Sequence, residues 1–520
     1  MNIIDELNPG WNTKKIDGAS IQDSLKIESI ELWWFYQRFL VRYVLPSYLK
    51  QKNGNLSENL SQGKEWFYSI FFRFMNYRNR KFLKYNESIK RKISKQNSPT
   101  GNIEREKALF LTYTNHLTEK GEIYRIEKIV QKISQEGILK PLVIFADPLS
   151  GISYFKIRKQ NHTIYAFISE EVKKKAEEAS QDLVKKWKSF NKKWLFGNQW
   201  EEVKWPLELF FSREFICHTA LYYFAFKNLL QQQKVKAVVI TASNGLYERC
   251  CMAAAFKLEI PVINIQHGEG LGCVNPGLLP GVTFAVFGDA YKERLTSWVK
   301  EKDIAITGPL TFDQICDYKK KSTMRKSGKI TLITGPFVDN NLLPSEVYFE
   351  YINKILQATS PFYKEIIIKL HPRERMREEY QKVIEKNNFK NVMIEERKDV
   401  NVLYQLLSSS DLVINFDSTV ALEAMILGKP ILTINFQLNL VPNYQESPFI
   451  GGLIVTMNDN LKEAVKEAMD QKWEAKREQI VQKFCFKTDG KAAERMVELI
   501  YEKAGMDHKT PVRETLKKSF

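Results

Sequence analysis

The chain has 520 residues, of which 44% are hydrophobic and 27% are charged, enough apolar material for two or three packed domains. Glycine and proline occur at ordinary frequencies, so a disordered, collagen-like or coiled-coil chain is excluded. The formal charge is +17, and the six cysteines are scattered without metal-ligand spacing. This cysteine usage indicates a reducing cytosol and neither a zinc site nor a disulfide framework.

The amino-terminal region, residues 1–135, is expected to be helical, because its apolar residues recur at intervals of three and four from residue 21 onwards. Aromatic and basic side chains are mixed in residues 32–50 and 66–85. That mixture suits an anionic membrane surface, and it equally suits buried amphipathic helices. No run of about 18 apolar residues predicts a membrane-spanning helix. No finger or RNP-like motif indicates nucleic acid.

Residues 136–310 read as a first α/β lobe. Short apolar runs alternate with longer helical patterns, a rhythm that predicts a parallel sheet with crossover helices. The expected strands lie at residues 141–147, 163–169, 237–243, 261–266, 283–289 and 304–309. The sequence therefore predicts a doubly wound, Rossmann-like lobe.

Residues 311–328 are rich in Lys, Asp and Ser and are expected to form a linker. The same rhythm restarts in residues 329–505 and ends in three helical stretches, and residues 506–520 read as a loose tail. The expected strands of this second lobe lie at residues 329–336, 365–372, 391–396, 411–417, 430–436 and 453–457. Ligands of such sheets bind beyond the carboxyl ends of the strands, so polar residues at those ends are the candidate site residues.

The strongest motif follows the strand that ends at Asp417. Ser418 and Thr419 come where a helix begins, and hydroxyls and free backbone N–H groups there suit a phosphate or diphosphate. Glu423 lies one turn further on, where a carboxylate can accept hydrogen bonds from ribose hydroxyls. The alternative is that Asp417 and Ser418 only cap the helix and that Glu423 pairs with a lysine.

A second strand of this lobe ends in His371, followed by Pro372. Its imidazole can donate a hydrogen bond to a phosphate oxygen, or can protonate that oxygen as it leaves with the nucleotide. Arg373 is a nearby basic candidate, although the exposed start of a helix explains it equally well.

Candidate bases come from the first lobe. His267 and Glu269 alternate with two glycines after a predicted strand, and Asp147 ends another. A glycine-rich turn with an incidental histidine is the alternative. T-G-P sequences stand at 307–309 and 334–336; the second is a candidate for a turn that faces the cleft, but a plain turn explains both better.

Four segments, in order, resemble the GT-B glycosyltransferases of surface and capsular polysaccharide synthesis. They are Q-H-G at 266–268, K-L-H-P at 369–372, D-S-T-V-A-L-E-A at 417–424 and G-K-P at 428–430. The patterns are similar to capsule-type transferases that use CMP-activated 3-deoxy-ulosonic or sialic acids, and to CDP-glycerol glycerophosphotransferases. The segment at 489–495 also resembles one that precedes the closing helix of such proteins. The resemblance covers about residues 237–501 and leaves out the helical amino-terminal region.

The resemblance implies a GT-B fold, with two Rossmann-like lobes and a helical amino-terminal extension. It places the donor phosphate on His371, Ser418 and Thr419 and the ribose on Glu423, and it gives the acceptor and the base to the first lobe. It further implies a metal-independent enzyme without a cofactor, whose partners are a CMP- or UDP-sugar and a glycan or lipid-linked acceptor. Such an enzyme would be cytoplasmic and peripheral on the inner face of the cell membrane. The absence of a D-x-D sequence at any predicted strand end agrees with metal independence.

Two alternatives remain open. UDP-N-acetylglucosamine 2-epimerases share the two-lobe fold, but they carry S-G-G-x-x-E-E where this chain has D-S-T-V-A-L-E-A, with one glutamate and no glycine pair. A non-catalytic protein that binds a glycan or a lipid could also keep the fold.

Overall fold

The computed structural model divides into two compact units, and each is described by itself. Unit 1 comprises Met1–Ile265, Gly272–Phe284 and Val497–Phe520, and unit 2 comprises Gln266–Leu271 and Ala285–Met496. Within them the structure describes residues 15–16, 19–20, 24–36, 105–117, 121–123, 126–146, 162–197, 200–243, 245–266, 281–319, 327–339, 342–416, 418–436 and 447–506.

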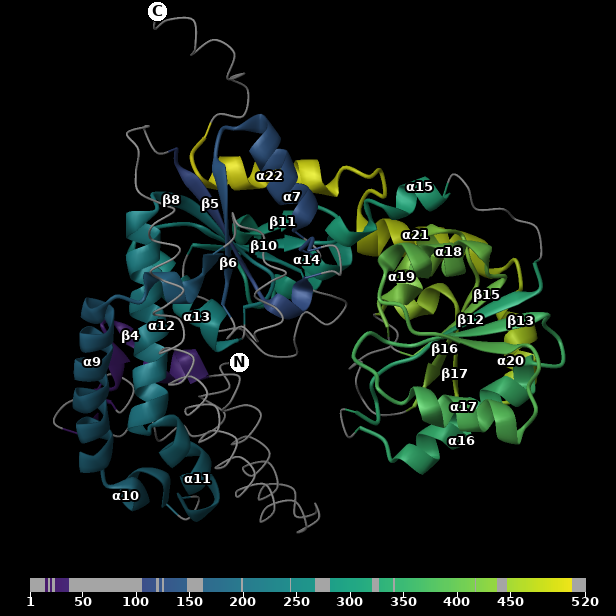
Figure 1. Ribbon diagram of the computed structural model, residues 1–520, viewed down its shortest axis with the longest axis horizontal. Coiled ribbons are helices and arrows are strands. Elements are labelled where there is room, and N and C mark those ends of the chain that lie inside the picture. The colour runs from purple at the N-terminus through teal and green to yellow at the C-terminus, as the bar shows by residue number, and fades with distance from the viewer. Residues whose placement is uncertain are drawn as a thin grey trace, which may run out of the picture. The chain divides into compact units, whose positions relative to one another are not determined.

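The first sheet has the order β11-β10-β9-β8-β5-β6-β7 (Figure 1), and its strands β5 to β9 lie in unit 1. Its strands are β5 (Lys107–Thr112), β6 (Lys140–Phe145), β7 (His162–Thr163), β8 (Val235–Ile240), β9 (Val262–Ile265), β10 (Val282–Val286) and β11 (Ile304–Ile306). β5 pairs in parallel with β6 on one side and with β8 on the other. β7 follows beyond β6, and β9 to β11 follow beyond β8. The strand order therefore reverses between β5 and β8, which is the topological switch point of the sheet.

Six helices of the described residues accompany this sheet. They are α7 (Glu127–Glu136), α9 (Glu170–Ser189), α10 (Lys192–Phe196), α11 (Trp200–Phe210), α12 (Arg213–Gln232) and α13 (Leu246–Lys257). The Ser169 side chain caps α9 by accepting the N–H of Val172, and the Glu171–Lys175 ion pair at 2.7 Å links successive turns. α9 buries one stripe, including Leu183 and Trp187, and it packs along α12.

The described part of the first aromatic segment belongs to the core of unit 1. Trp33 and Tyr36 are fully buried, and their rings contact Phe211 at 4.8 and 5.9 Å. The hydroxyl of Tyr36 shares a hydrogen bond of 3.1 Å with Thr219 of α12. These residues therefore support the buried alternative and not the membrane surface. Residues 37–104, which hold the rest of the aromatic segments, lie outside the described residues.

Unit 2 contains a six-stranded sheet of order β14-β13-β12-β15-β16-β17, parallel throughout (Figure 1). Its strands are β12 (Lys329–Ile333), β13 (Glu365–Lys369), β14 (Val392–Glu395), β15 (Leu412–Asn415), β16 (Ile431–Asn435) and β17 (Leu453–Thr456). The order reverses between β12 and β15, so this sheet also has a switch point.

Helices cover both faces of the six-stranded sheet. Alternate strand residues such as Leu332, Ile368 and Ile414 join one core with α16 (Ser345–Thr359), α17 (Arg377–Lys386) and α20 (Leu461–Ala468). The other helices of the unit are α14 (Asp289–Leu295), α15 (Ile315–Lys319), α18 (Val400–Ser409), α19 (Val420–Ile426), α21 (Trp473–Cys485) and the first half of α22 (Ala492–Lys503).

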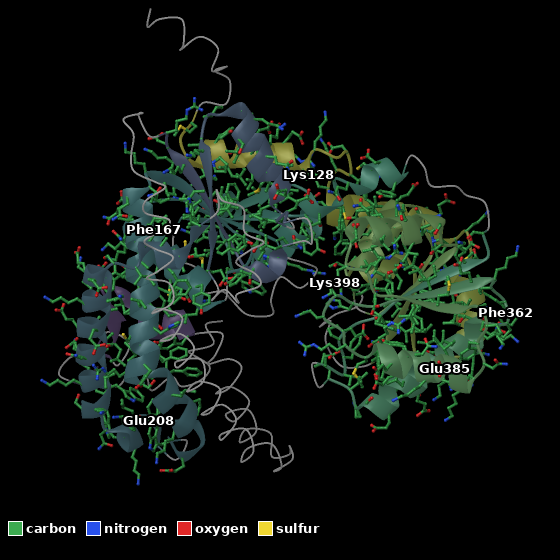
Figure 2. The ribbon with its side chains drawn as sticks, in the orientation of Figure 1. Lys128, Phe167, Glu208, Phe362, Glu385 and Lys398 are labelled. Carbon is green, nitrogen blue, oxygen red and sulfur yellow. The ribbon has the colours of Figure 1, made fainter. Side chains whose placement is uncertain are left out.

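The exposed large apolar side chains among the described residues of unit 2 are Trp298, Leu342, Phe362 and Met393. Phe362, labelled in Figure 2, is 51% exposed just beyond α16, and the ammonium of Lys462 lies 4.9 Å from its ring. Isolated exposed rings of this kind are ordinary for a protein surface, and the cation–π contact stabilises Phe362.

The predicted fold class, two Rossmann-like α/β lobes, is confirmed by the two parallel sheets. Two predicted elements are wrong. Lys107–Thr112 was included in the helical region, yet it forms β5, a fully buried strand without the alternation that reveals half-buried strands. Residues 163–169 were expected to be a strand, but only His162–Thr163 pairs with β6, and Ile164–Phe167 form a 3-10 turn. The first sheet therefore begins ahead of residue 136.

In the described part of the chain, no helix is long and apolar enough to cross a membrane. The predicted tail, from residue 507 onwards, and residues 320–326 of the predicted linker lie outside the described residues. The linker residues that are described include the short helix α15.

Candidate functional site

Three polar residues follow the strands around the switch point of the six-stranded sheet. Thr334 follows β12, His371 follows β13 on one side of it, and Ser418 follows β15 on the other. Adjacent strands lie about 4.8 Å apart, so the ends of β13 and β15 are separated by roughly 10 Å. The structure thus brings two of the predicted donor-binding residues, His371 and Ser418, to one edge of one sheet.

The imidazole of His371 is held in one orientation by the turn that it begins. Its Nδ1 accepts the backbone N–H of Arg373 at 3.1 Å, and its backbone carbonyl accepts the N–H of Glu374 at 2.9 Å. A ring nitrogen that accepts a hydrogen bond carries no proton, so the proton of the neutral ring is on Nε2. His371 therefore has a fixed Nε2–H donor.

The environment of His371 keeps this ring neutral. Burial lowers the pKa of His371 to about 4, and the positive charges of Arg373 and Lys369 contribute in the same direction. Lys369 is itself buried at the end of β13, where its ammonium donates to the carbonyl of Leu370 at 2.9 Å. At neutral pH the imidazole is uncharged and can donate a hydrogen bond through Nε2.

Glu374 connects this turn to β12 and to the helices behind it. One carboxylate oxygen accepts the backbone N–H of His371 at 3.0 Å and the hydroxyl of Thr334 at 2.5 Å. The other oxygen accepts the hydroxyl of Tyr380, which shares a hydrogen bond of 2.8 Å with the hydroxyl of Tyr348. Burial raises the pKa of Glu374, while these hydrogen bonds oppose the increase. We call these five residues the Glu374 network.

Ser418 and Thr419 lead into α19. The backbone N–H of Ser418 donates to the Asn415 side chain at 3.3 Å, and Ser418 Oγ accepts the N–H of Val420 at 3.3 Å. Thr419 is the N-cap residue of α19 and forms no side-chain cap, so the Ser418 bond closes the turn before the helix, and the Ser418 hydroxyl proton remains available as a donor. Asn415 is fully buried, and its side-chain nitrogen has no hydrogen-bond partner among the described residues.

Glu423 is buried in α19. Its carboxylate accepts a hydrogen bond of 3.1 Å from the hydroxyl of Tyr404, so its partner is a tyrosine and not the lysine considered above. Burial raises the pKa of Glu423 to about 7, and the Tyr404 hydrogen bond only partly offsets this increase. Binding of a ribose by Glu423 stays a prediction.

The other predicted site residues divide into two groups. Arg373 is described and exposed, and its backbone contributes to the site through the bond to His371. The remaining candidates lie outside the described residues, so their roles stay predictions: Asp147, His267, Glu269 and Asp417.

The segment 489–495 has a structural role in unit 2. The Asp313 carboxylate accepts the backbone N–H groups of Ala492 and Ala493 at 3.0 Å each and caps α22. Arg495 donates to the carbonyl of Thr307 at 2.7 Å and pairs with Asp489 at 2.9 Å. These bonds hold the T-G-P sequence at 307–309 against α22. They explain that sequence and the segment 489–495 without a ligand.

Sequence reasoning treated Thr334 as part of a T-G-P turn and missed Glu374. The signal for Thr334 was its place at the end of the strand next to the one that ends in His371. Glu374 gave no comparable signal, because its partners Thr334 and Tyr380 come from separate elements.

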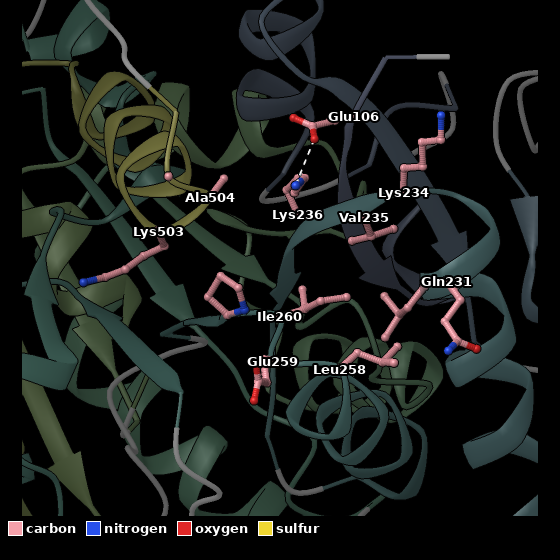
Figure 3. A pocket seen from close by; sticks show the side chains of 13 residues that line it. Glu106, Gln231, Lys234, Val235, Lys236, Leu258, Glu259, Ile260, Lys503 and Ala504 are labelled. Atoms are coloured by element: carbon pink, nitrogen blue, oxygen red, sulfur yellow. Dashed lines mark ion pairs between the residues drawn. The ribbon is translucent and has the colours of Figure 1, made fainter. Parts of the chain in front are cut away.

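Unit 1 has a pocket at the edge of its sheet where the strands begin (Figure 3). It is lined by residues at the amino ends of the strands, among them Val235 and Lys236 of β8 and Pro261 before β9. Glu106 and Lys236 form an ion pair of 2.9 Å there. Ligands of doubly wound sheets bind at the carboxyl ends, so this pocket is not the candidate site.

Comparison with known proteins shows a similarity in the second half of the chain. Residues 282–501 match the family described as UDP-N-acetylglucosamine 2-epimerase. No curated protein matches the chain.

Three solved structures illustrate the structural likeness. The UDP-GlcNAc 2-epimerase of Neisseria meningitidis bound to UDP-GlcNAc is 13% identical, with 76% of this chain and 99% of that chain covered and a TM-score of 0.46. The MurG of Acinetobacter baumannii is 14% identical, with the same coverage and a TM-score of 0.44. The wall teichoic acid polymerase TagF is 13% identical, with 86% and 99% covered and a TM-score of 0.44. At such values these likenesses assign no family to the chain.

Proposed function

We propose that this protein is an enzyme that acts on a nucleotide sugar and transfers the sugar to a glycan or lipid-linked acceptor in cell-surface polysaccharide synthesis. The observation that carries the proposal is the fixed Nε2–H of His371 at the carboxyl edge of the six-stranded sheet. Ser418 supplies a second donor at the same edge, roughly 10 Å away, a separation that a nucleotide diphosphate and its sugar can span.

A neutral N–H donor suits the phosphate of a nucleotide that leaves during transfer. As the bond between the sugar and the phosphate breaks, negative charge collects on the phosphate oxygens, and a donor already in place stabilises that charge. Because the His371 ring is neutral, this role replaces the alternative in which His371 protonates the leaving phosphate. The base that activates the acceptor stays open between Glu269, His267 and Asp147.

The family similarity supports nucleotide-sugar chemistry and also favours a second candidate, an epimerase-like isomerase. Inverting a carbon that bears hydrogen needs one group to remove a proton and another to return it. In the described part of the site, Glu374 is fully engaged as an acceptor and His371 is a neutral donor. This favours transfer, for which a phosphate-binding donor suffices in this unit.

The proposal extends to the conditions of the reaction. We expect no metal and no cofactor beyond the donor, so activity should survive an excess of EDTA. We also expect a cytoplasmic enzyme that associates with the inner face of the cell membrane through its +17 charge. Flotation of the full-length chain with anionic liposomes at low salt tests this association, and a protein that stays in the soluble fraction contradicts it.

The test of function has two steps. The purified chain is first screened by thermal shift against CMP, CDP, UDP and GDP, since a ligand of the native state raises Tm. It is then incubated with nucleotide sugars that carry the nucleotide found to bind, with and without glycan acceptors. The reaction is followed by ¹H and ³¹P NMR. Free nucleotide that appears with an acceptor supports transfer, whereas a new sugar isomer without acceptor identifies the isomerase. No shift with any nucleotide refutes both.

A further inference from the structure

The seven-stranded sheet has its switch point in unit 1, between β5 and β8, and several aromatic side chains lie near it. Tyr113 directly follows β5, and Tyr247 lies in the first turn of α13, which follows β8. Their ring centroids are 6.4 Å apart. Tyr222 and His218 of α12 lie against Tyr247 at 4.5 and 6.0 Å. We call these four residues the ring cluster.

The ring cluster has a buried base and an accessible side. Tyr222 is fully buried, and its hydroxyl donates to that of Tyr165 at 2.7 Å, which fixes the base of the cluster. Tyr113, His218 and Tyr247 are only half-buried. Rings that are anchored below and partly open above form a firm apolar wall at the edge where such sheets bind ligands.

His218 adds a polar group to this wall. Its ring lies 4.7 Å from that of Tyr222, and its nitrogens form no hydrogen bond with any described residue. Burial lowers the pKa of His218 to about 4, so the ring is neutral at physiological pH. A neutral imidazole has one donor and one acceptor nitrogen, and a hydroxyl group can satisfy either of them.

The charges nearby disfavour an anionic ligand. The carboxylate of Glu248 is buried at the N-terminus of α13, where a Cβ added to Gly245 would collide with it. It occupies the region of positive potential that would otherwise attract a phosphate. The guanidinium of Arg249 lies over the Trp34 ring at 4.7 Å and donates to the Trp34 carbonyl, so it is engaged elsewhere. An uncharged ligand therefore fits this edge better than a phosphate.

We propose that the ring cluster binds a neutral sugar ring, the terminal residue of the glycan acceptor. An apolar C–H face of the pyranose lies against Tyr113 and Tyr247, and one of its hydroxyls bonds to His218. Flat aromatic side chains with a few placed polar groups are the usual means of holding such a ligand. The identity of the sugar as an acceptor rests on the proposed function, whereas its binding to unit 1 does not.

Saturation-transfer NMR on the full-length chain tests the binding directly. The probes are the methyl β-glycosides of glucose, galactose and N-acetylglucosamine, offered without nucleotide. We expect saturation of the ring C–H protons of at least one probe, and binding weaker by about three- to tenfold in Tyr247→Ala. Tyr247→Phe should retain the binding, because it keeps the ring. Trp194→Ala is the matched control, since Trp194 is an exposed aromatic residue of unit 1 outside the cluster.

Two outcomes overturn the inference: no saturation of any glycoside by the wild type, or equal saturation by Tyr247→Ala and wild type. If Tyr247→Ala does not fold, His218→Phe takes its place and should lower the affinity about threefold or more, the loss of one hydrogen bond. Cytidine and uridine test the alternative ligand: if either binds the wild type and fails to bind the same variants, the cluster is a nucleobase site, which also contradicts the inference.

Parallel titrations with CMP, CDP, UDP and GDP separate this inference from the proposed function. Glycoside binding without nucleotide binding refutes the proposed function and leaves the ring cluster as a sugar site. Nucleotide binding without glycoside binding refutes the ring cluster and leaves the proposed function.

Discussion

The two sheets share a topology and differ in what they place at the switch point. At the six-stranded sheet the strand ends carry hydroxyl and imidazole donors, Thr334, His371 and Ser418. At the seven-stranded sheet they carry the rings of Tyr113 and Tyr247. The connectivity decides where a ligand can bind, and the side chains decide whether that ligand is a phosphate or an uncharged ring.

The histidines make the same comparison at the level of one side chain. The pKa values of His371 and His218 are both lowered to about 4, mainly by burial. The N–H of Arg373 fixes the proton of His371 on Nε2, whereas no described residue fixes the proton of His218. His371 is therefore built to donate in one direction, and His218 can donate or accept as its ligand requires.

Each switch point is followed by a helix with a buried glutamate. The largest expected effect is that of one of them, Glu423, on how the free energy of unfolding depends on pH. Glu248 lies at the N-terminus of α13. Glu423 lies in α19, where it accepts the Tyr404 hydroxyl, and burial raises its pKa from 4.5 to about 7. The folded state then binds the Glu423 proton more tightly than the unfolded chain does, so the free energy of unfolding falls as pH rises from 4.5 to 7. Over this range the wild type should lose about 3 kcal/mol relative to Glu423→Gln.

Urea unfolding of both proteins at several pH values measures this loss, provided that each transition is two-state. Glu474→Gln, a change on the exposed side of α21, is the matched control and should keep the pH dependence of the wild type. Parallel curves for the wild type and Glu423→Gln would show that the Glu423 carboxyl titrates normally.

Removing the fixed donor should separate the two switch points functionally. His371→Ala should weaken nucleotide binding by about 10- to 100-fold, because it deletes a hydrogen bond to a charged phosphate. Isothermal titration calorimetry with the nucleotide that shifts Tm measures this change. His162→Ala, a histidine on the edge strand β7 of the other sheet, should bind as the wild type does. Unchanged affinity in His371→Ala would remove the phosphate site from this strand end.

Glu374 should matter for both stability and binding. Glu374→Gln replaces one acceptor oxygen by an amide that cannot accept, and it thus breaks the bond to either Thr334 or Tyr380. We expect a loss of about 1–3 kcal/mol in the free energy of unfolding and a several-fold weaker affinity for nucleotide, measured by urea unfolding and calorimetry. Glu378→Gln on the exposed face of α17 is the control. A stability loss with normal affinity would reduce Glu374 to a structural residue.

The smallest expected effect is that of pH on the His371 contribution. Because its pKa is lowered to about 4, His371 stays neutral at every pH from 5.5 to 8. The ratio of the nucleotide affinities of wild type and His371→Ala should therefore stay constant over this range. The probe is the intact nucleotide sugar, whose phosphates do not titrate in this range. A ratio that grows towards pH 5.5 would mean that the bound form is an imidazolium.

The sequence predicts most of the fold, because strand and helix patterns alternate clearly in the second half. All six strands of the second sheet were expected. β5 was missed because Ala108–Leu111 is apolar throughout and has neither the strand period nor a helix length. The hydrophobic pattern of a sequence identifies a strand well when turn residues flank the strand. It does so less well when a charged segment precedes the strand.

The site was predictable only in its outline. Strand ends point to His371 and Ser418 from the sequence alone, but the state of the His371 ring depends on bonds that form after folding. The turn that directs the Arg373 N–H onto Nδ1 and the carboxylate of Glu374 belong to tertiary structure. Burial of Glu423 is likewise invisible in a pattern that fits an exposed, ribose-binding glutamate.

The Glu374 network also sets the rate at which one amide proton leaves the protein. The His371 N–H begins a loop, where backbone amides ordinarily exchange with solvent within seconds, yet it donates to a carboxylate tied to β12 and α17. In deuterated water this amide should keep its hydrogen as long as the neighbouring strand does. A peptide spanning the end of β13 would then be lighter by one retained proton than the same peptide from Glu374→Gln, in which the network is broken.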